Sequence, residues 1–150
     1  MGPSQGALFT DVVLEIFRVN GALIAAGNAL AKGTGLTSAR WQVLGAIALA
    51  PAPPTVAQIA RVMGLTRQGV QRLVDELERE GIVRRGSHPE SVRARPVQLT
   101  PKGEAIYAET MRRQRPWASR IAKGIPPSAL HTCLEALRAV RTRLERQSEG

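Results

Sequence analysis

The sequence predicts a mainly α-helical chain that carries one small β-hairpin. Apolar residues recur at the three- and four-residue spacing of amphipathic helices through most of the 150 residues. Residues 82–99 differ, because they hold two short β-prone runs on either side of a polar tip. Stretches rich in Gly and Pro, at 51–54 and 124–128, separate the periodic segments. Together these observations predict helices before and after a single hairpin.

The first expected helix covers about residues 8–32 and ends in the glycine-containing turn 32–35. Its apolar stripe consists of Val12, Ile16, Val19, Leu23 and Leu30. Thr37 is placed to cap a second helix that continues to Ala50. The prolines of residues 51–54 stop that helix.

A third and a fourth helix are expected around a short turn. Thr55 and Gln58 form a capping-box pattern, in which each side chain accepts from a free backbone N–H at the helix start. The third helix ends at Gly64, which adopts the positive φ of a tight turn at little cost. Thr66 is placed to cap the fourth helix, and Gly81 ends it. Two short helices joined in this way are typical of a helix-turn-helix.

The fourth helix has two different faces. Its apolar face consists of Val70, Leu73, Val74 and Leu77. Gln68, Arg72, Asp75 and Arg79 are expected opposite, with Arg67 and Gln71 at the flanks. Arg pairs with guanine edges and Gln with adenine edges, so this face is suited to reading DNA. Gly69 costs about 1 kcal/mol against Ala within a helix, which indicates close approach by a partner. The alternative is an ordinary helix with a solvated polar face.

The segment after the fourth helix is interpreted as a wing. The runs 82–85 and 95–99 are the expected strands, and Pro96 requires the return strand to be an edge or to begin there. The hairpin carries Arg84, Arg85, Arg93 and Arg95. A basic hairpin beside a recognition helix can follow the DNA backbone or enter a narrow minor groove. The alternative is a surface hairpin whose basic residues are incidental.

The last two expected helices form part of a frame. Thr100 and Pro101 suit the N-cap and first position of a helix that continues to Lys123. The last helix has an apolar stripe of Leu130, Leu134, Leu137 and Leu144. Cys133 is the single cysteine, which excludes an internal disulfide. Because it lies near this stripe, it is interpreted as a buried structural thiol.

Composition narrows the classes of function. The net charge of +9 favours a polyanionic partner, and an aromatic content of 3% argues against a protein that stacks single-stranded bases. His88 and His131 lack partners at metal-ligand spacing, and no catalytic motif is present. We therefore expect no enzyme, metal or cofactor. Residues 22–31 are too short to span a bilayer, and no secretory signal is found, so we expect a cytoplasmic protein without a membrane partner.

Taken together, these segments resemble the MarR family of winged-helix regulators. The resemblance is carried by Leu36, Thr37, Trp41, Val43 and Leu44, by 56–60, by 71–83 and by 99–103. It implies one domain over residues 1–150, with a winged helix-turn-helix at about 36–100 and dimerisation helices at about 8–35 and 101–147. The family's wing commonly carries Asp-x-Arg; here Arg93 is retained, and Ser91 stands where the Asp usually does.

The resemblance implies a ligand-responsive repressor that binds a pseudo-palindromic site on double-stranded DNA as a homodimer. The expected DNA-binding residues are Thr66, Arg67, Gln68, Gly69, Gln71, Arg72, Arg84, Arg85, Arg93 and Arg95. It also implies a cleft for a small aromatic or phenolic anion. The expected cleft residues are Asn20, Leu23, Arg40, Trp41, Tyr107 and Met111, with Arg40 facing the anion and Trp41 chiefly a core anchor. The alternatives are a winged-helix module for protein interaction without sequence-specific DNA binding, and terminal helices that fold back as a monomeric bundle.

Overall fold

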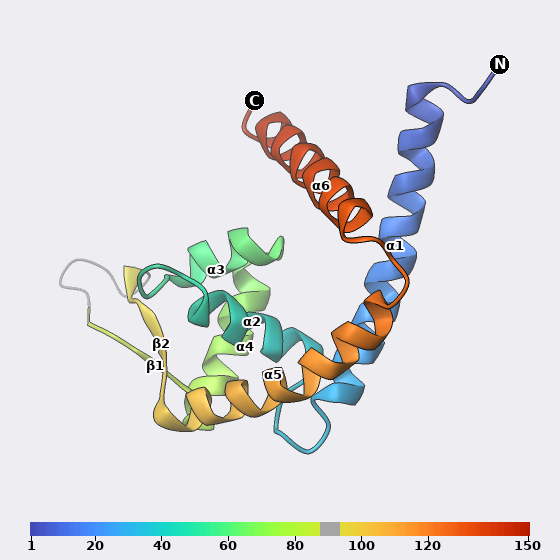
Figure 1. The fold of residues 1–150 in the computed structure, drawn as a ribbon. Coiled ribbons are helices and arrows are strands. Elements are labelled where there is room, and N and C mark those ends of the chain that lie inside the picture. Colours follow the sequence, from blue (N-terminus) through green and yellow to red (C-terminus); the bar gives the residue numbers. More distant parts are fainter. Residues whose placement is uncertain (88–93) are drawn as a thin grey trace. The chain divides into compact units, whose positions relative to one another are not determined.

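The computed structural model describes residues 1–87 and 94–150. The mainly α-helical class with a small hairpin is confirmed (Figure 1). The helices are α1 (Gln5–Leu30), α2 (Ser38–Ala48), α3 (Val56–Met63), α4 (Arg67–Arg79), α5 (Pro101–Ala122) and α6 (Pro127–Ser148), and the strands are β1 (Val83–Arg85) and β2 (Val97–Leu99). The chain divides into two compact units, Met1–Gln114 and Arg115–Gly150.

Local capping sets the helix boundaries. α1 begins at Gln5 rather than near residue 8, because the Ser4 hydroxyl accepts a hydrogen bond from the N–H of Ala7 at 3.2 Å. Thr37 caps α2 as expected. The capping box of α3 is formed in both directions, at 3.2 Å to the Thr55 hydroxyl and 2.9 Å to the Gln58 amide oxygen. The caps at Thr37 and Thr55 confirm the predicted starts of α2 and α3, whereas α1 starts earlier than predicted.

The turn between α3 and α4 depends on a glycine. Gly64 has a φ of 67°, in the left-handed region. The N–H of Leu65 then donates to the carbonyl of Ala60 at 3.0 Å and closes the end of α3. Gly81, after α4, has a φ of 72° and turns the chain into the hairpin. The predicted helix-turn-helix is confirmed.

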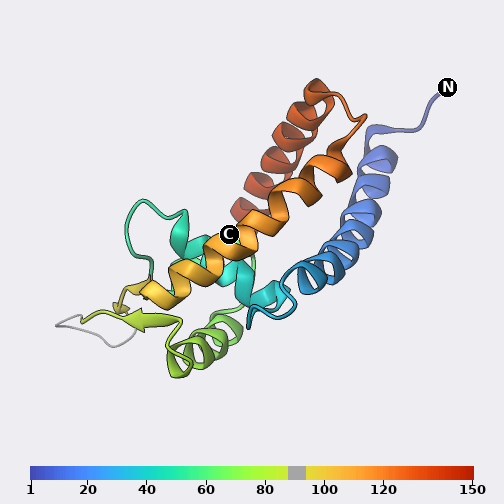
Figure 2. The same ribbon diagram turned by 60° about the horizontal axis from the view of Figure 1, so that its bottom comes forward.

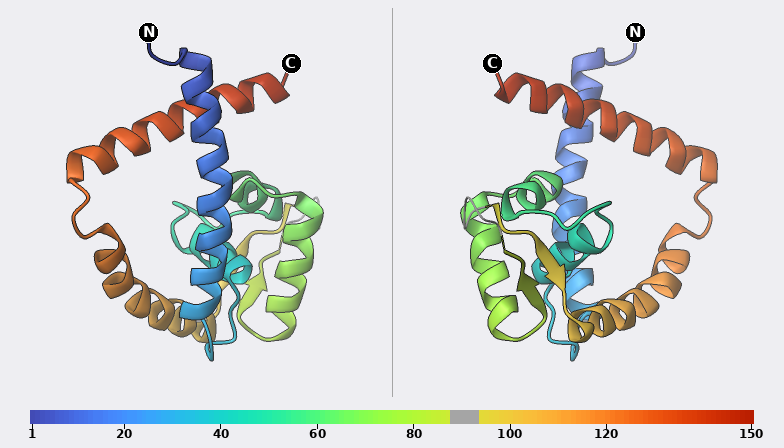
Figure 3. Two further views of the ribbon diagram at one scale, coloured as in Figure 1. Left: turned by 90° about the vertical axis from the view of Figure 1, so that its right-hand side faces the viewer. Right: turned by 90° about the vertical axis from the view of Figure 1, so that its left-hand side faces the viewer.

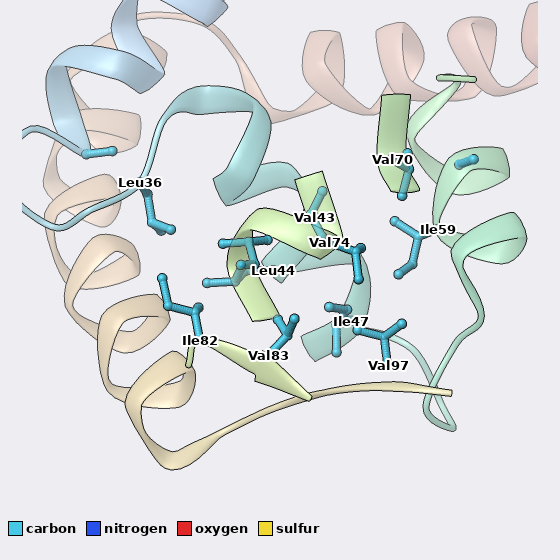
Figure 4. Packing of buried hydrophobic residues seen from close by; sticks show 13 residues of the cluster. Leu36, Val43, Leu44, Ile47, Ile59, Val70, Val74, Ile82, Val83 and Val97 are labelled. Carbon is cyan, nitrogen blue, oxygen red and sulfur yellow. The ribbon is translucent and has the colours of Figure 1, made fainter. Parts of the chain in front are cut away.

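A single hydrophobic core fixes α4 against its neighbours. In Figure 4 the side chains of Val43, Leu44, Ile59 and Val74 converge from α2, α3 and α4. The core also contains Val70 and Leu77 of α4, both fully buried, together with residues of the hairpin. Burying each such side chain contributes about 1.5–3 kcal/mol, so the polar half of α4 is held facing outward. Trp41 packs against this core, as its interpretation as an anchor requires.

The hairpin is a short antiparallel ladder that lies beside α4 (Figure 3). Val83 pairs with Leu99, and Arg85 pairs with Val97. β2 begins directly after Pro96, as expected from the missing proline N–H. The N–H of Val97 donates at 2.8 Å to the carbonyl of Pro54, which anchors the proline-rich loop to the hairpin. In Figure 2, β2 leads straight into α5.

Close contacts join α1 to the rest of the first unit. The N–H of Ser38 donates to the side-chain oxygen of Asn28 at 2.7 Å. Gly27 is buried against Ser38, and a Cβ at this position would lie 2.7 Å from the Ser38 hydroxyl. Arg113 on α5 donates to the carbonyls of Leu30 and Lys32 at 3.1 and 2.9 Å. By contrast, the earlier part of α1 exposes many large apolar side chains, including Leu8, Phe9, Val12, Leu14, Ile16, Phe17, Val19 and Leu23.

The second unit contains the end of α5 and the whole of α6. No residue of α6 is buried, and its stripe of Leu130, Leu134, Leu137 and Leu144 is exposed. Cys133 is exposed as well, so its interpretation as a buried thiol is wrong for the single chain as far as the structure describes it. Among the helices of the described residues, none is long and apolar enough to cross a membrane.

Candidate nucleic-acid interface

The first turns of α4 present an open polar surface. The Thr66 hydroxyl accepts a hydrogen bond from the N–H of Gly69 at 3.1 Å and fixes the start of the helix. Arg67, Gln68 and Arg72 are exposed, as is Gln71. Because Val70 and Val74 are fully buried on the other face, these polar side chains are directed away from the core.

A shallow recess continues this surface onto α3. It has a volume of about 280 Å³ and is lined by Val56, Ala57, Arg67, Gln68 and Gln71. The side chains that the sequence predicts at the start of α4 therefore share one face with the start of α3. In helix-turn-helix proteins, a helix start that carries long polar side chains enters the major groove.

Gly69 has little within the chain to explain it. A Cβ there would meet only the Thr66 hydroxyl, at 3.1 Å, among atoms of the described residues. The helix interior normally favours Ala over Gly by about 1 kcal/mol. The contact with the Thr66 hydroxyl is tight, and no other atom of the described residues would lie within 4 Å of the added carbon, which leaves room for the predicted approach of a partner.

The wing arginines have different surroundings. Arg84 and Arg95 are exposed, and the Arg84 guanidinium donates to the amide oxygen of Gln98 at 3.2 Å. Arg93, the predicted minor-groove contact, lies outside the described residues, together with Ser91 and His88. Its predicted role stays a prediction.

Arg85 faces α4 and not the solvent. Only 15% of its side chain is exposed, and its guanidinium forms ion pairs with Asp75 and, at 3.0 Å, with Glu78. The Glu78 carboxylate also accepts from the backbone N–H of Arg85 at 3.2 Å. This differs from the free DNA contact expected for Arg85, because the acidic side of α4 already satisfies its charge.

Asp75 is the centre of this arrangement. Its carboxylate accepts hydrogen bonds from Arg85 and, at 3.0 Å, from the side-chain amide of Gln71. The hydrogen bond from Arg85 is the largest cause that lowers the pKa of Asp75 below its usual range. The group therefore stays ionised at neutral pH and connects the wing to a predicted base-reading side chain.

The sequence contains a signal for these partners that the helix-face analysis missed. Asp75, Glu76, Glu78 and Glu80 lie in the second half of α4 and at its end. The helix dipole destabilises negative charge near a helix C-terminus, so such a cluster predicts cationic partners nearby. The cations are Arg40 and Arg85, each bound to two of the four carboxylates.

Arg40 is engaged inside the chain. Its guanidinium lies 3.1 Å from the Glu76 carboxylate and 2.6 Å from that of Glu80, and 18% of the side chain is exposed. It also donates to the carbonyl of Gly35 at 3.2 Å. An anionic ligand would have to compete with both carboxylates, so its binding to Arg40 would cost more free energy than the sequence suggests. The ligand contact of Arg40 stays a prediction.

Replacing Arg40 by Ala is expected to lower the free energy of unfolding by about 1–2 kcal/mol. The change leaves Glu76 and Glu80, one helical turn apart, without the cation that binds both. The matched control is Arg112→Ala, which removes a pair with Glu109 at the exposed surface and is expected to have a much smaller effect. Urea unfolding of both variants at one protein concentration measures the difference. Equal losses of unfolding free energy would contradict a stabilising role for the ion pairs of Arg40 with Glu76 and Glu80.

The other predicted ligand residues do not line one common cavity. Asn20 and Leu23 are exposed on α1, while Tyr107 and Met111 are half-buried on α5. A cavity of about 750 Å³ lies between the end of α2, the loop 51–54 and α3, and none of these residues lines it. Tyr107 lines a second cavity of about 490 Å³, next to the hairpin. The described residues contain no cluster of His, Cys, Asp and Glu that could hold a metal ion.

Comparison with known proteins gives consistent matches. The profile of the MarR family matches residues 34–94. An uncharacterized protein of Mycobacterium tuberculosis (strain ATCC 25618 / H37Rv) is 32% identical over 127 residues, which cover 85% of this chain and 87% of the relative.

Solved structures of similar chains extend the likeness to nearly the whole length. A transcriptional regulator (MarR family) from Rhodococcus sp. RHA1 is 28% identical, with 92% of this chain and 96% of that chain covered and a TM-score of 0.77. The structure of CouR from Rhodococcus jostii RHA1 bound to p-coumaroyl-CoA has the same identity and coverage, with a TM-score of 0.78.

Proposed function

The chain belongs to the MarR family of transcriptional regulators, and we propose that it binds a specific site on double-stranded DNA as a cytoplasmic homodimer. The observation that carries this proposal is the polar surface at the start of α4. Arg67, Gln68 and Arg72 are exposed there on a helix whose opposite face is fixed in the core. Arg and Gln side chains on a helix held in this way suit base edges in the major groove.

The wing adds contacts outside the major groove. Arg84 and Arg95 are exposed and are assigned to the DNA backbone, while Arg93 is assigned to an adjacent minor groove. Thr66 and Gly69 are assigned to close approach of a phosphate at the start of α4. We assign Arg85 to holding the wing against α4, because its guanidinium is already paired with Asp75 and Glu78.

Replacing Gln68 or Arg72 by Ala is expected to weaken binding to the selected site by about 1–3 kcal/mol, with little effect on nonspecific duplexes. The specific site would first be selected from a random duplex pool with the wild-type protein. Binding isotherms on the selected and on a scrambled duplex, at fixed salt, measure the two effects separately. Folding is expected to survive, because both side chains are exposed.

A matched control is Arg79→Ala. Arg79 is exposed at the other end of α4, where its guanidinium donates to the carbonyl of Asp75 at 3.3 Å. This change is expected to leave specific binding nearly intact. If Gln68→Ala and Arg72→Ala weaken specific and nonspecific binding equally, the residues contact phosphate and not bases. If the wild type selects no sequence, the alternative of a protein-interaction module is favoured.

The dimer proposal is supported by two exposed apolar surfaces. One is the N-terminal part of α1, and the other is the leucine stripe of α6. Patches of this extent on a soluble chain mark interaction surfaces. A second copy of the chain supplies an equivalent surface, and a two-fold dimer matches a pseudo-palindromic DNA site.

We also propose control by a small aromatic or phenolic anion. Support comes from CouR, a relative of similar fold whose structure contains p-coumaroyl-CoA. Such a ligand would meet Asn20, Leu23, Trp41, Tyr107 and Met111. Arg40 would join them by exchanging a carboxylate of α4 for that of the ligand, which would weaken the ion pairs between α2 and α4.

A further inference from the structure

We propose that Asp75 and Arg85 fix the orientation of the Gln71 side-chain amide, so that Gln71 reads one adenine in each half of the DNA site. The inference rests on the proposed DNA binding and assigns the specificity of one position within it. Asp75 and Arg85 act as positioning residues, because Gln71 is the one member of this trio that is placed against a base.

The chemistry of the contact fixes which end of the amide faces Asp75. The Gln71 Nε2 lies 3.0 Å from Oδ1 of Asp75. An ionised carboxylate accepts hydrogen bonds and donates none, so Gln71 must direct Nε2 toward it. Among the described residues, Oε1 and the second N–H of Nε2 have no hydrogen-bond partner, and Gln71 lies on the exposed surface of α4.

This orientation matches adenine. In the major groove adenine offers the N6 amino group as a donor and N7 as an acceptor. The free Oε1 of Gln71 accepts from N6, and the remaining N–H donates to N7. Without Asp75, rotation of the amide by half a turn exchanges its oxygen and nitrogen, and the exchanged form presents two mismatched groups to the same base.

The wing holds Asp75 in its turn. The Arg85 guanidinium contacts the same oxygen, Oδ1, that accepts from Gln71, and its other amino group is 3.0 Å from Glu78. Arg85 is shielded on β1, in a ladder with β2, so it is a rigid support. The hydrogen bond from Arg85 also lowers the pKa of Asp75 and keeps the acceptor ionised. The charge of Arg85 further offsets the repulsion between Asp75 and DNA phosphates.

Gln68 provides an internal comparison. It lies on the same exposed part of α4 as Gln71. In the contacts of the described residues, however, its side-chain amide has no partner comparable to Asp75. The orientation of the Gln68 amide is therefore set only when a partner binds, and changes at Asp75 should not alter the base preference that Gln68 produces.

The test is selection of bound duplexes from a random pool by the full-length wild type and by variants. Gln71→Ala is expected to lose an adenine preference of about tenfold or more at one position per half-site. Asp75→Ala and Arg85→Gln are expected to reduce that same preference by about two- to tenfold. The preferences at other positions should stay unchanged, because the base contacts made there are not altered.

Three further variants sharpen the result. Glu78→Gln weakens one partner of Arg85 but leaves the Asp75–Gln71 contact, so adenine preference should change by less than about twofold. Asp75→Asn keeps the side-chain shape, and its adenine preference should lie between those of the wild type and Asp75→Ala. This variant provides the test if Asp75→Ala unfolds in part. Asp75→Ala combined with Gln71→Ala should be no worse at the adenine than Gln71→Ala alone, because the two act as one unit.

The outcomes separate this inference from the function on which it rests. If the wild type selects a sequence but Asp75→Ala and Asp75→Asn keep its full adenine preference, the inference is overturned and the DNA-binding function stands. The same holds if the Asp75 variants weaken binding to all sequences equally. A wild type that selects no sequence would overturn the proposed function itself.

Discussion

Deletion of residues 126–150 is expected to convert the protein from a homodimer into soluble aggregates or an unfolded chain. The deletion removes α6, whose leucine stripe is exposed. It would also leave the exposed apolar residues of α1, among them Phe9 and Phe17, without the partner surface that we propose. Domains that expose such surfaces associate nonspecifically. Light scattering gives the mass, and circular dichroism gives the helix content.

Two neighbouring point variants provide a finer test of the same interface. Leu134 lies in the apolar stripe of α6, whereas Glu135 follows it on a different face of the helix. Leu134→Ser is expected to shift the protein toward monomer at low concentration, and Glu135→Ser is expected to leave the dimer intact. A folded, monodisperse monomer after the deletion would contradict a dimer held by α6.

Local signals in the sequence were enough to predict the helix-turn-helix. A capping box and a glycine turn depend on residues a few positions apart, so Thr55, Gln58 and Gly64 could be interpreted without knowledge of the fold. The apolar face of α4 follows from its periodicity in the same way. Burial of Val70, Val74 and Leu77 confirmed it.

Contacts between distant residues were beyond that kind of prediction. Arg40 and Glu76 are 36 positions apart, and their ion pair depends on how α2 crosses α4. Arg85 was predicted as a DNA contact because the sequence of a basic hairpin does not show on which face of the strand each arginine lies. Its direction is set by the register Arg85 to Val97 and by the acids of α4. The predicted ligand residues are subject to the same limit, because they come from helices that are far apart in the sequence.

The junction of hairpin and α5 shows the same limit at one glycine. The sequence predicts a helix start at Thr100 and Pro101, and α5 begins at Pro101. The close approach of Gly103 to the backbone of Ile82 has no local signal in the sequence. Gly103 is buried, and a Cβ on it would lie 2.1 Å from the carbonyl oxygen of Ile82, far inside the contact distance. The carbonyl of Ile82 is itself held, since it accepts from the N–H of Thr100 at 3.1 Å.

Gly103→Ala is therefore expected to lower the free energy of unfolding by about 2–4 kcal/mol, a large effect for one methyl group. The added carbon meets backbone and not a flexible side chain, so it can be accommodated only if α5 moves away from Ile82. That movement breaks the hydrogen bonds of Thr100 to the carbonyls of Gly81 and Ile82, at 2.6 and 3.1 Å from its hydroxyl. The hairpin then loses its support next to α4, and DNA binding should weaken in parallel.

The matched control for this prediction is Gly45→Ala, in the middle of α2. A Cβ there has its nearest neighbour, the Tyr107 hydroxyl, at 3.9 Å, which is an ordinary contact. Because Ala is favoured over Gly in a helix by about 0.5–1 kcal/mol, this change should leave stability equal or slightly higher. Urea unfolding of wild type and both variants at one protein concentration measures the difference, since dimer stability depends on concentration. Equal stabilities of the two variants would show that α5 can shift freely at Gly103, and the close packing of α5 against Ile82 would then have no role in holding the wing.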